Sequence, residues 1–312
     1  MAYPLMIISL LILSAVSLII GSGDLLTTTT QAQQLLWLSR WPRTAAVILT
    51  GVCMTICGVI MQLLVRNRFV EPSTTGTTEA SMIGLLIAAV WFPEWPVLAK
   101  MTLASVCALA GLMIFLLLTR RLPRSQPLLI PLVGLIYGGI LGAVATYFAF
   151  QTELLQYLSI WMTGEFSGVI AGRYELLWLA GAFALLSYLV ADQFTIAGFG
   201  QQASQSLGLN YHSIVALGVA TVAICSSLVV VTVGMLPFIG LIVPNLVSRW
   251  MGDNLRQTLP MVAGVGAIFT LVADILGRVL RYPYEIPAGT IFGALGAVVF
   301  LWLLFQGRQH DK

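Results

Sequence analysis

Charge is scarce in this chain. Only 9% of its 312 residues are charged and 59% are hydrophobic, whereas a soluble domain has about 25% charged residues. Lysine occurs only at Lys100 and Lys312, and the net charge of +3 comes without a run of basic residues. These shortages exclude a soluble globular domain and give no support to a nucleic-acid partner.

Metal ligands are scarce as well. The only histidines are His212 and His310, which are too few for a histidine metal site. The four cysteines fall inside apolar segments without a Cys-x-x-Cys pair: Cys53, Cys57, Cys107 and Cys225. We interpret them as small buried side chains rather than metal ligands or disulfide partners. The sequence therefore predicts neither a metal site nor a cofactor.

A nucleotide-binding P-loop is missing. Its signature, G-x-x-x-x-G-K-[ST], needs a lysine directly after a glycine. Here Lys100 follows Ala99 and Lys312 follows Asp311. The chain therefore has no P-loop ATPase site of its own, and we predict no catalytic residues in it.

Long apolar segments are what the chain does contain. A membrane helix needs about 20 mainly apolar residues to cross a hydrocarbon core of about 30 Å. The sequence predicts an all-α polytopic membrane protein with about ten such helices. They cover residues 4–20, 44–65, 80–91, 101–118, 127–150, 174–190, 214–233, 237–247, 261–279 and 289–305. The third is too short alone and must begin inside the polar segment 73–79, and 151–173 is expected to be a loop with interfacial aromatic residues.

These helices are expected to form one transmembrane domain over residues 1–312. Its first half is about 1–192, a polar cytoplasmic segment is about 193–212, and its second half is about 213–312. Ten helices place both termini on one side of the membrane. With the termini inside, the inner segments carry more Lys and Arg than the outer ones, as the positive-inside rule requires, so we expect both termini in the cytoplasm.

Arginines nevertheless remain at the outer ends of two helices. Arg40 and Arg43 precede the second helix, and Arg278 and Arg281 end the ninth. One interpretation is snorkelling with local pairing, because Asp274 and Arg278 lie four residues apart on one helix face. The other is a docking surface for an acidic soluble partner, since several exposed charges together steer and orient an incoming protein.

The order of motifs resembles the permeases of iron-siderophore and vitamin B12 ABC importers. In the first half the matching residues are Arg40-Trp41-Pro42-Arg43, Gly51, Gly58, Gln62, Asn67 and Pro72. In the second half they are Gly234, Pro237, Gly240, Pro244, Arg249, Gly252-Asp253, Leu259-Pro260, Ala273-Asp274, Arg278, Glu285, Pro287 and Gly289. The resemblance covers nearly the whole chain.

The chain departs from the family pattern in a few places. Asn245 replaces a histidine, Val298 replaces a proline, and Arg68-Phe69-Val70 replaces Pro-Leu-Ala. The run from Phe69 to Gly76, Phe-Val-Glu-Pro-Ser-Thr-Thr-Gly, is similar to permeases for ferric catecholate siderophores such as vibriobactin, anguibactin or enterobactin. This similarity implies a ferric catecholate as the cargo.

The resemblance implies a type II ABC importer permease, in which two subunits surround a path near their fifth and tenth helices. Five glycines fall on those helices: Gly134, Gly138, Gly142, Gly289 and Gly293. Their spacing allows helix backbones to approach closely, either around the path or in packing within one subunit. Gln62 also allows two roles: its side chain either forms a hydrogen bond to another helix or faces the path.

A family permease also carries a cytoplasmic coupling helix between its sixth and seventh helices. The corresponding segment here contains Gly198, Ala203, Ser206, Leu207 and Gly208. Its composition fits a short helix capped by glycine. Without the resemblance the same residues would indicate only a polar inner loop.

The roles of three further polar residues stay open. Arg66 and Arg68 either contact anionic lipid or the inner gate, or simply complement the dipole at the end of the second helix. Glu79 lies near the start of the third helix, where an ionisable group usually faces protein or water.

We therefore expect the permease subunit of an ABC importer that moves a ferric siderophore, of catecholate type, across the bacterial inner membrane. Its expected partners are ABC ATPase subunits, a second permease that is a paralogue or an identical copy, a periplasmic or lipoprotein binding protein, and membrane lipid. The alternatives are a corrinoid or haem permease of the same family, an ion-gradient-driven transporter, or a structural membrane protein. An ion-driven transporter should bury carboxylates at mid-membrane, and only Glu79 and Asp274 come into question.

Overall fold

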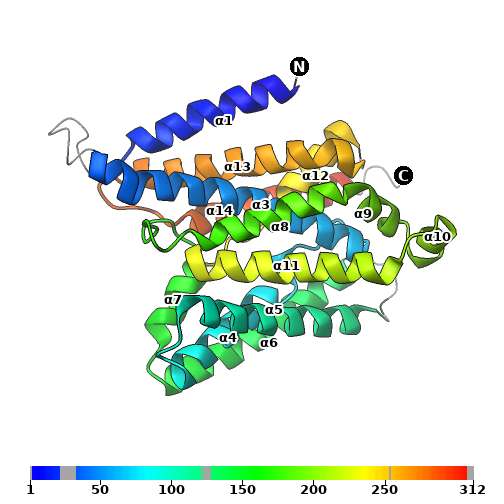
Figure 1. The fold of residues 1–312 in the computed structure, drawn as a ribbon, viewed down its shortest axis with the longest axis horizontal. Coiled ribbons are helices and arrows are strands. Elements are labelled where there is room, and N and C mark those ends of the chain that lie inside the picture. Colours follow the sequence, from blue (N-terminus) through cyan, green and yellow to red (C-terminus); the bar gives the residue numbers. More distant parts are fainter. Residues whose placement is uncertain (1, 22–32, 121, 123–127, 253, 308–312) are drawn as a thin grey trace.

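The computed structural model describes residues 2–21, 33–120, 122, 128–252 and 254–307. Within these ranges every regular element is a helix (Figure 1). The longer helices are α1 (Ala2–Ile19), α3 (Trp41–Val65), α4 (Thr77–Trp91), α5 (Val97–Thr119), α6 (Leu129–Gln151), α8 (Leu176–Leu189), α11 (Tyr211–Val233), α12 (Ile239–Met251), α13 (Leu255–Val279) and α14 (Ala288–Gly307). The shorter ones are η1 (Leu36–Arg40), η2 (Pro72–Thr74), α7 (Leu155–Thr163), α9 (Ala191–Gly198) and α10 (Gln201–Ser206).

Each predicted apolar segment corresponds to one of the longer helices. In the part of the chain that the structure describes, six helices are long and apolar enough to cross a membrane, namely α1, α3 together with η1, α5, α6, α11 and α13. The pair α8 and α9 forms a seventh candidate, bent by 67° at its break, while α4 and the apolar part of α14 are shorter. The count of ten crossings stays a prediction, because α12 has only 13 residues.

Three local expectations can be compared with the structure directly. The third helix begins at Thr77, inside the polar segment as predicted. The expectation that 151–173 is only a loop is wrong, because α7 occupies its centre. Cys53, Cys57 and Cys225 are buried as predicted, and Cys107 is partly buried.

Helix α3 lies at the centre of the bundle. It contacts α13 and α12 on one side and α11 and α8 on the other (Figure 1). Two of its glycines allow these contacts: a Cβ on Gly51 would lie 2.5 Å from the carbonyl oxygen of Gly266 on α13, and one on Gly58 would overlap the backbone of Gly240 on α12. In lipid, helices associate through such close packing, because the solvent offers no hydrophobic drive between them. The two ends of α3 and its crossing with α12 position the residues described next.

Candidate functional site

The N-terminal end of α3 lies beside a network of four charged side chains. Arg43 Nη2 lies 2.8 Å from Asp274 Oδ1 and 2.8 Å from Glu285 Oε2. Arg278 Nη2 lies 2.6 Å from Asp274 Oδ2, which confirms the predicted pairing of Asp274 with Arg278. Asp274 is thus held between two guanidinium groups, and only Glu285 is substantially exposed. A buried carboxylate paired on both sides keeps its charge compensated.

Two of the arginines that were predicted at the outer face, Arg40 and Arg278, bind the carbonyl groups at the C-terminal end of α1. A helix leaves its last four carbonyl groups without partners in the helix. Here those acceptors receive guanidinium donors at 2.8–2.9 Å: Arg40 donates to the carbonyls of Leu18 and Ile19, and Arg278 donates to those of Ser17 and Ile20. Arg278 also donates to the hydroxyl of Ser17 at 2.7 Å. The local-pairing interpretation therefore accounts for Arg40 and Arg278.

The same four arginines were predicted to dock a partner protein. Arg40 and Arg278 are each only 6% exposed, so a partner approaching the intact bundle meets little of either side chain. Arg43 is partly covered by its two carboxylates, and Arg281 is exposed with its guanidinium 5.9 Å from the Tyr284 ring. A docking role for these arginines stays a prediction. The charged side chains that a partner could reach are those of Arg281 and Glu285.

The glycine row of α6 packs within the chain. A Cβ on Gly134 would overlap the carbonyl oxygen of Thr74, and one on Gly138 would lie 3.5 Å from the Glu79 carboxylate. Gly142 comes next, with the Glu79 side chain 3.8 Å from its would-be Cβ. The row therefore faces η2 and the first turn of α4. This favours packing within one subunit for these three glycines.

The glycines of α14 differ from one another. A Cβ on Gly289 would overlap the carbonyl oxygen of Thr163, and its N–H donates to the carbonyl of Gly164 at 2.8 Å. A Cβ on Gly293 would meet nothing within 4 Å in the described part of the chain. Gly289 is thus part of internal packing, and Gly293 lies on an open face of α14.

Several breaks between helices meet at the level of α7 and α12. Met235 N donates to the carbonyl of Trp161 at 2.7 Å, and Glu165 N donates to that of Val233 at 2.8 Å. Non-helical backbone inside a membrane protein is tolerated where the protein itself satisfies its polar groups. These main-chain bonds do so by joining segments that lie far apart in the sequence.

Glu71 was not predicted as a site residue from the sequence, yet its carboxylate connects the segment before α4 to the start of α12. Its side chain is fully buried. Its Oε1 accepts the hydroxyl of Ser73 at 2.5 Å and the backbone N–H of Phe238 at 2.6 Å. Phe238 is the N-cap residue of α12, so Glu71 places a carboxylate at the helix N-terminus, where the unpaired N–H groups and the helix dipole favour an acceptor.

A local signal for Glu71 does exist. The order Glu71, Pro72 and Thr74 forms a capping box, in which Glu71 N donates to the Thr74 hydroxyl at 3.1 Å. Such a box marks a helix start. It carries no information about Phe238, which lies 167 residues further along the chain.

The C-terminal end of α3 has an unusual backbone conformation. Arg66 adopts the left-handed conformation with φ 54°. The N–H of Arg66 donates to Leu63 O at 3.2 Å and that of Asn67 to Gln62 O at 2.9 Å, the bond pattern with which glycine usually ends a helix. Gln62 itself donates to the carbonyl of Gly240 at 3.4 Å, so it joins α3 to α12.

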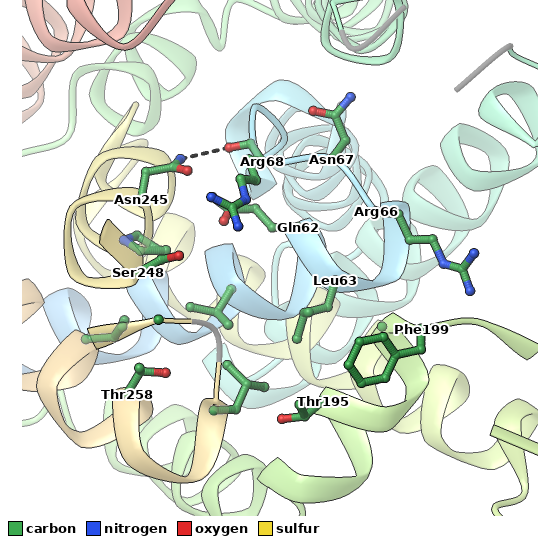
Figure 2. Close-up of a pocket in the computed structure, with 16 residues that line it drawn as sticks. Gln62, Leu63, Arg66, Asn67, Arg68, Thr195, Phe199, Asn245, Ser248 and Thr258 are labelled. Atoms are coloured by element: carbon green, nitrogen blue, oxygen red, sulfur yellow. Dashed lines mark hydrogen bonds between the residues drawn. The ribbon is translucent and has the colours of Figure 1, made fainter. Parts of the chain in front are cut away.

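A cavity of about 270 Å³ opens beside this end, between α3, α9, α12 and α13 (Figure 2). It is lined by Val59, Gln62, Leu63, Arg66, Asn67, Arg68, Thr195, Gly198, Phe199, Pro244, Asn245, Ser248, Gly252, Leu255, Thr258 and Val262. Leu63 and Phe199 lie on one side in Figure 2, and Ser248 and Thr258 on the other. Gln62 and Gly198, both predicted as site residues, therefore share one cavity.

The predicted coupling segment is a short helix followed by a glycine. Gln201–Ser206 form α10, and Gly208 has a left-handed φ of 76°. Leu209 N donates to Ser204 O at 2.9 Å and Gly208 N to Gln205 O at 3.0 Å, which is a glycine helix cap as predicted. Gly200, with φ 104°, lies directly against the guanidinium of Arg66. The segment protrudes at one end of the bundle (Figure 1), and its role in coupling stays a prediction.

Comparison with known proteins agrees with this architecture. The chain is 42% identical over 308 residues to the petrobactin import system permease protein YclN of Bacillus subtilis, covering 97% of this chain and 98% of that one. It is 39% identical over 312 residues to the ferric-anguibactin transport system permease protein FatD of Vibrio anguillarum, with 97% and 98% covered. The vitamin B12 import system permease protein BtuC of Vibrio cholerae is 30% identical, with 90% and 85% covered.

A solved structure has the same fold. An inward-facing ABC transporter described as of the metal-chelate type superposes with a TM-score of 0.78 at 23% identity, covering 96% of this chain and 97% of that one. The model of the FecCD transport family matches residues 4–306. With nearly its whole length matched, the chain belongs to the FecCD transport family.

Proposed function

We propose that the chain is the permease subunit of an ABC importer for a ferric siderophore, and that the siderophore is of catecholate type. The observation that supports this most is the order of sequence identity among its relatives. Those named for petrobactin and ferric-anguibactin are 39–42% identical to it, whereas those named for iron-hydroxamate, iron-citrate or vitamin B12 are 29–31% identical. The corrinoid alternative is therefore less favoured.

The proposed assembly places the chain in the cytoplasmic membrane with both termini inside. ATPase subunits would seat the α10 helix with its residues Ala203, Ser206 and Leu207, because the described chain presents α10 at the end of the bundle. A second permease, identical or paralogous, would complete the path along α6 and α14. Neither role requires this chain to break a bond in the cargo.

An ion-gradient-driven transporter is the alternative from a different class. The expectation that Glu79 and Asp274 are the only candidate buried carboxylates is wrong, because Glu71 is fully buried as well. Glu71 and Asp274, however, are both engaged in hydrogen bonds or ion pairs with the chain itself. Such bonds account for their burial without a transported ion.

Uptake of labelled iron tests the cargo. Deletion of this chain should reduce uptake of a ferric catecholate siderophore to background, because no other subunit would complete the path. Uptake of ferric hydroxamate and of a corrinoid should stay at the wild-type level, and a plasmid copy of the chain should restore the catecholate. Loss of corrinoid uptake alone would overturn the siderophore assignment.

Charge reversal at Arg281 tests the docking surface. Arg281 is exposed, and unlike Arg40 and Arg278 it does not donate to the carbonyls at the end of α1. Arg281→Glu should therefore leave membrane insertion intact. A rim charge contributes up to about 1 kcal/mol, so the binding protein should dock about fivefold more weakly at low salt. The measurement is binding-protein affinity for the reconstituted importer, with Arg120→Glu at the opposite end of the bundle as a control. Equal affinity for both variants and wild type would remove Arg281 from the docking surface.

A further inference from the structure

Helix α3 ends in a conformation that its own sequence does not favour. Arg66 follows the last residue of α3 and has φ 54° and ψ 43°, in the left-handed region. Glycine is the usual residue at this position because it has no Cβ, whereas other residues there cost free energy. Such a cost persists mainly where function or the surrounding structure requires that side chain. The contacts of the Arg66 side chain therefore indicate why the chain has an arginine here.

The guanidinium of Arg66 lies against the turn that joins α9 to α10. Gly200 in this turn has φ 104° and ψ 176°, a combination that is nearly restricted to glycine. A Cβ on Gly200 would overlap Nη2 and Cζ of Arg66, so the guanidinium fills the space that any side chain at position 200 would need. The two unusual backbone conformations thus meet at one contact, although they lie far apart in the sequence.

A second contact lies one turn earlier on α3. A Cβ on Gly198 would lie 2.9 Å from Leu63 Cδ2, so Leu63 packs against the end of α9. Leu63, Arg66 and Phe199 lie on the same side of the cavity in Figure 2. The last turn of α3 and the residue after it therefore contact both glycines that flank Phe199.

Helix α10 is in turn fixed to α9. The buried hydroxyl of Ser204 donates to the carbonyl of Gly200 at 2.7 Å and to that of Ile196 at 3.2 Å. The backbone N–H of Ser204 also donates to Gly200 O at 2.9 Å. Because one side chain on α10 bonds to both α9 and the turn, we expect α9, the turn and α10 to move as one unit.

We propose that Arg66 is a positioning residue that connects α10 to the centre of the bundle. Its guanidinium holds the Gly200 turn, and its backbone continues directly from α3. Helix α3 contacts α12, α13, α11 and α8, so a displacement of α10 reaches these helices through the Arg66 contact. This role in transport rests on the proposed function of α10, whereas the effect of Arg66 on the turn does not.

Hydrogen exchange of the purified full chain tests the contact with the turn. Arg66→Gly removes the guanidinium, so the amides of residues 199–209 should exchange about fivefold faster, as expected for the loss of one modest contact. The substitution also relieves the left-handed strain. Since Arg66 is exposed, its removal leaves no buried cavity, and Tm should stay at the wild-type value or rise slightly.

This combination separates a positioning role from a general contribution to stability. Wild-type exchange over residues 199–209 in Arg66→Gly would overturn the proposal. A fall in Tm with faster exchange along the whole chain would overturn it as well, because Arg66 would then only stabilise the bundle.

Glu153→Gly is the matched control. Glu153 has φ 59°, is exposed and lies between α6 and α7. The substitution relieves the same kind of strain without touching the turn between α9 and α10, so exchange over residues 199–209 should stay at the wild-type level. Equally fast exchange there in both glycine variants would assign the effect to the loss of strain and overturn the proposal.

Arg66→Asn removes the guanidinium without the extra backbone freedom of glycine. Asparagine adopts the left-handed conformation more readily than most residues, and its side chain is too short to reach Gly200 as arginine does. Exchange over residues 199–209 should rise as it does in Arg66→Gly. A rise for the glycine variant alone would show that backbone freedom at position 66 is the cause, against the proposed contact.

Transport by the assembled importer tests the coupling step. The measurement is the amount of labelled iron imported per ATP hydrolysed, with the binding protein present. This ratio should fall about fivefold for Arg66→Gly and stay at the wild-type value for Glu153→Gly. Leu207→Glu changes an exposed side chain at the end of α10 and should lower the ratio directly.

The Leu207 variant distinguishes failure of this inference from failure of the proposed function. A lowered ratio for Leu207→Glu with a wild-type ratio for Arg66→Gly would overturn the positioning role and leave α10 as the coupling helix. Wild-type ratios for both variants would overturn the coupling role of α10, and the role of Arg66 in transport with it.

Discussion

Glu71→Ala is expected to cause a large loss of stability in this permease. The substitution leaves two buried donors without a partner, the N–H of Phe238 and the hydroxyl of Ser73. Each unsatisfied donor costs about 1–3 kcal/mol, so we expect a loss of about 2–6 kcal/mol and a corresponding fall in Tm. The negative charge at the N-terminus of α12 is lost as well.

The comparison with Glu71→Gln separates hydrogen bonding from charge. Glutamine keeps an acceptor oxygen for Phe238 but carries no charge, so its Tm should lie between those of wild type and Glu71→Ala. The control is Glu94→Ala, which removes an exposed carboxylate between α4 and α5. The measurement is Tm in detergent together with labelled-iron uptake. A Tm for Glu71→Ala equal to that of the Glu94 control would rule out the cap.

Sequence patterns predicted the helices well where apolar segments are long. The predicted segment 101–118 corresponds to Val97–Thr119, and 261–279 lies inside Leu255–Val279. Length and apolar composition alone suffice there, because a segment in lipid must satisfy its backbone within its own helix. The same reasoning ended the predicted segment at residue 190, close to the break after Leu189, but it assigned the residues beyond to a polar segment and predicted neither α9 nor its 67° bend.

Polar contacts between residues far apart in the chain could not be predicted from the sequence. Arg40 and Arg278 looked like surface charges, because their acceptors are main-chain carbonyls at the end of α1, and carbonyls have no sequence signature. Glu71 was visible only as one position in a polar run. Its partner at Phe238 is determined by how α3 and α12 cross, which is a tertiary property.

The glycines lead to the same conclusion, because their spacing is visible in the sequence whereas the residues that they contact are not. The spacing of Gly134, Gly138 and Gly142 predicted a close approach of helix backbones. A Cβ would overlap a backbone only at Gly134, where it meets Thr74 O, whereas at Gly138 and Gly142 it would make ordinary contact with the Glu79 side chain. A row of glycines predicts that another segment packs closely against the helix, but it does not identify that segment. The identity of the neighbour decides the effect of a substitution, and Gly58 is the clearest case.

Gly58→Ala is expected to destabilise the bundle although it favours the helix. In an exposed helix, replacing glycine by alanine is favourable by about 1 kcal/mol. At Gly58 the new methyl group overlaps the backbone of Gly240, and a backbone cannot rotate away as a side chain does. Overpacking costs about 1–3 kcal/mol and occasionally more, and moving α12 also pulls Phe238 from Glu71 and Gly240 from Gln62.

Gly139 on α6 is the matched control for this prediction. A Cβ there would meet nothing within 4 Å in the described chain, so Gly139→Ala should raise Tm slightly or leave it unchanged. Gly58→Ala should lower Tm, and Gly58→Leu should prevent accumulation of folded protein in the membrane. The opposite signs of one chemical change follow from packing alone, since both sites are interior helix positions. An increase in Tm for Gly58→Ala would mean that α3 and α12 do not cross at these glycines.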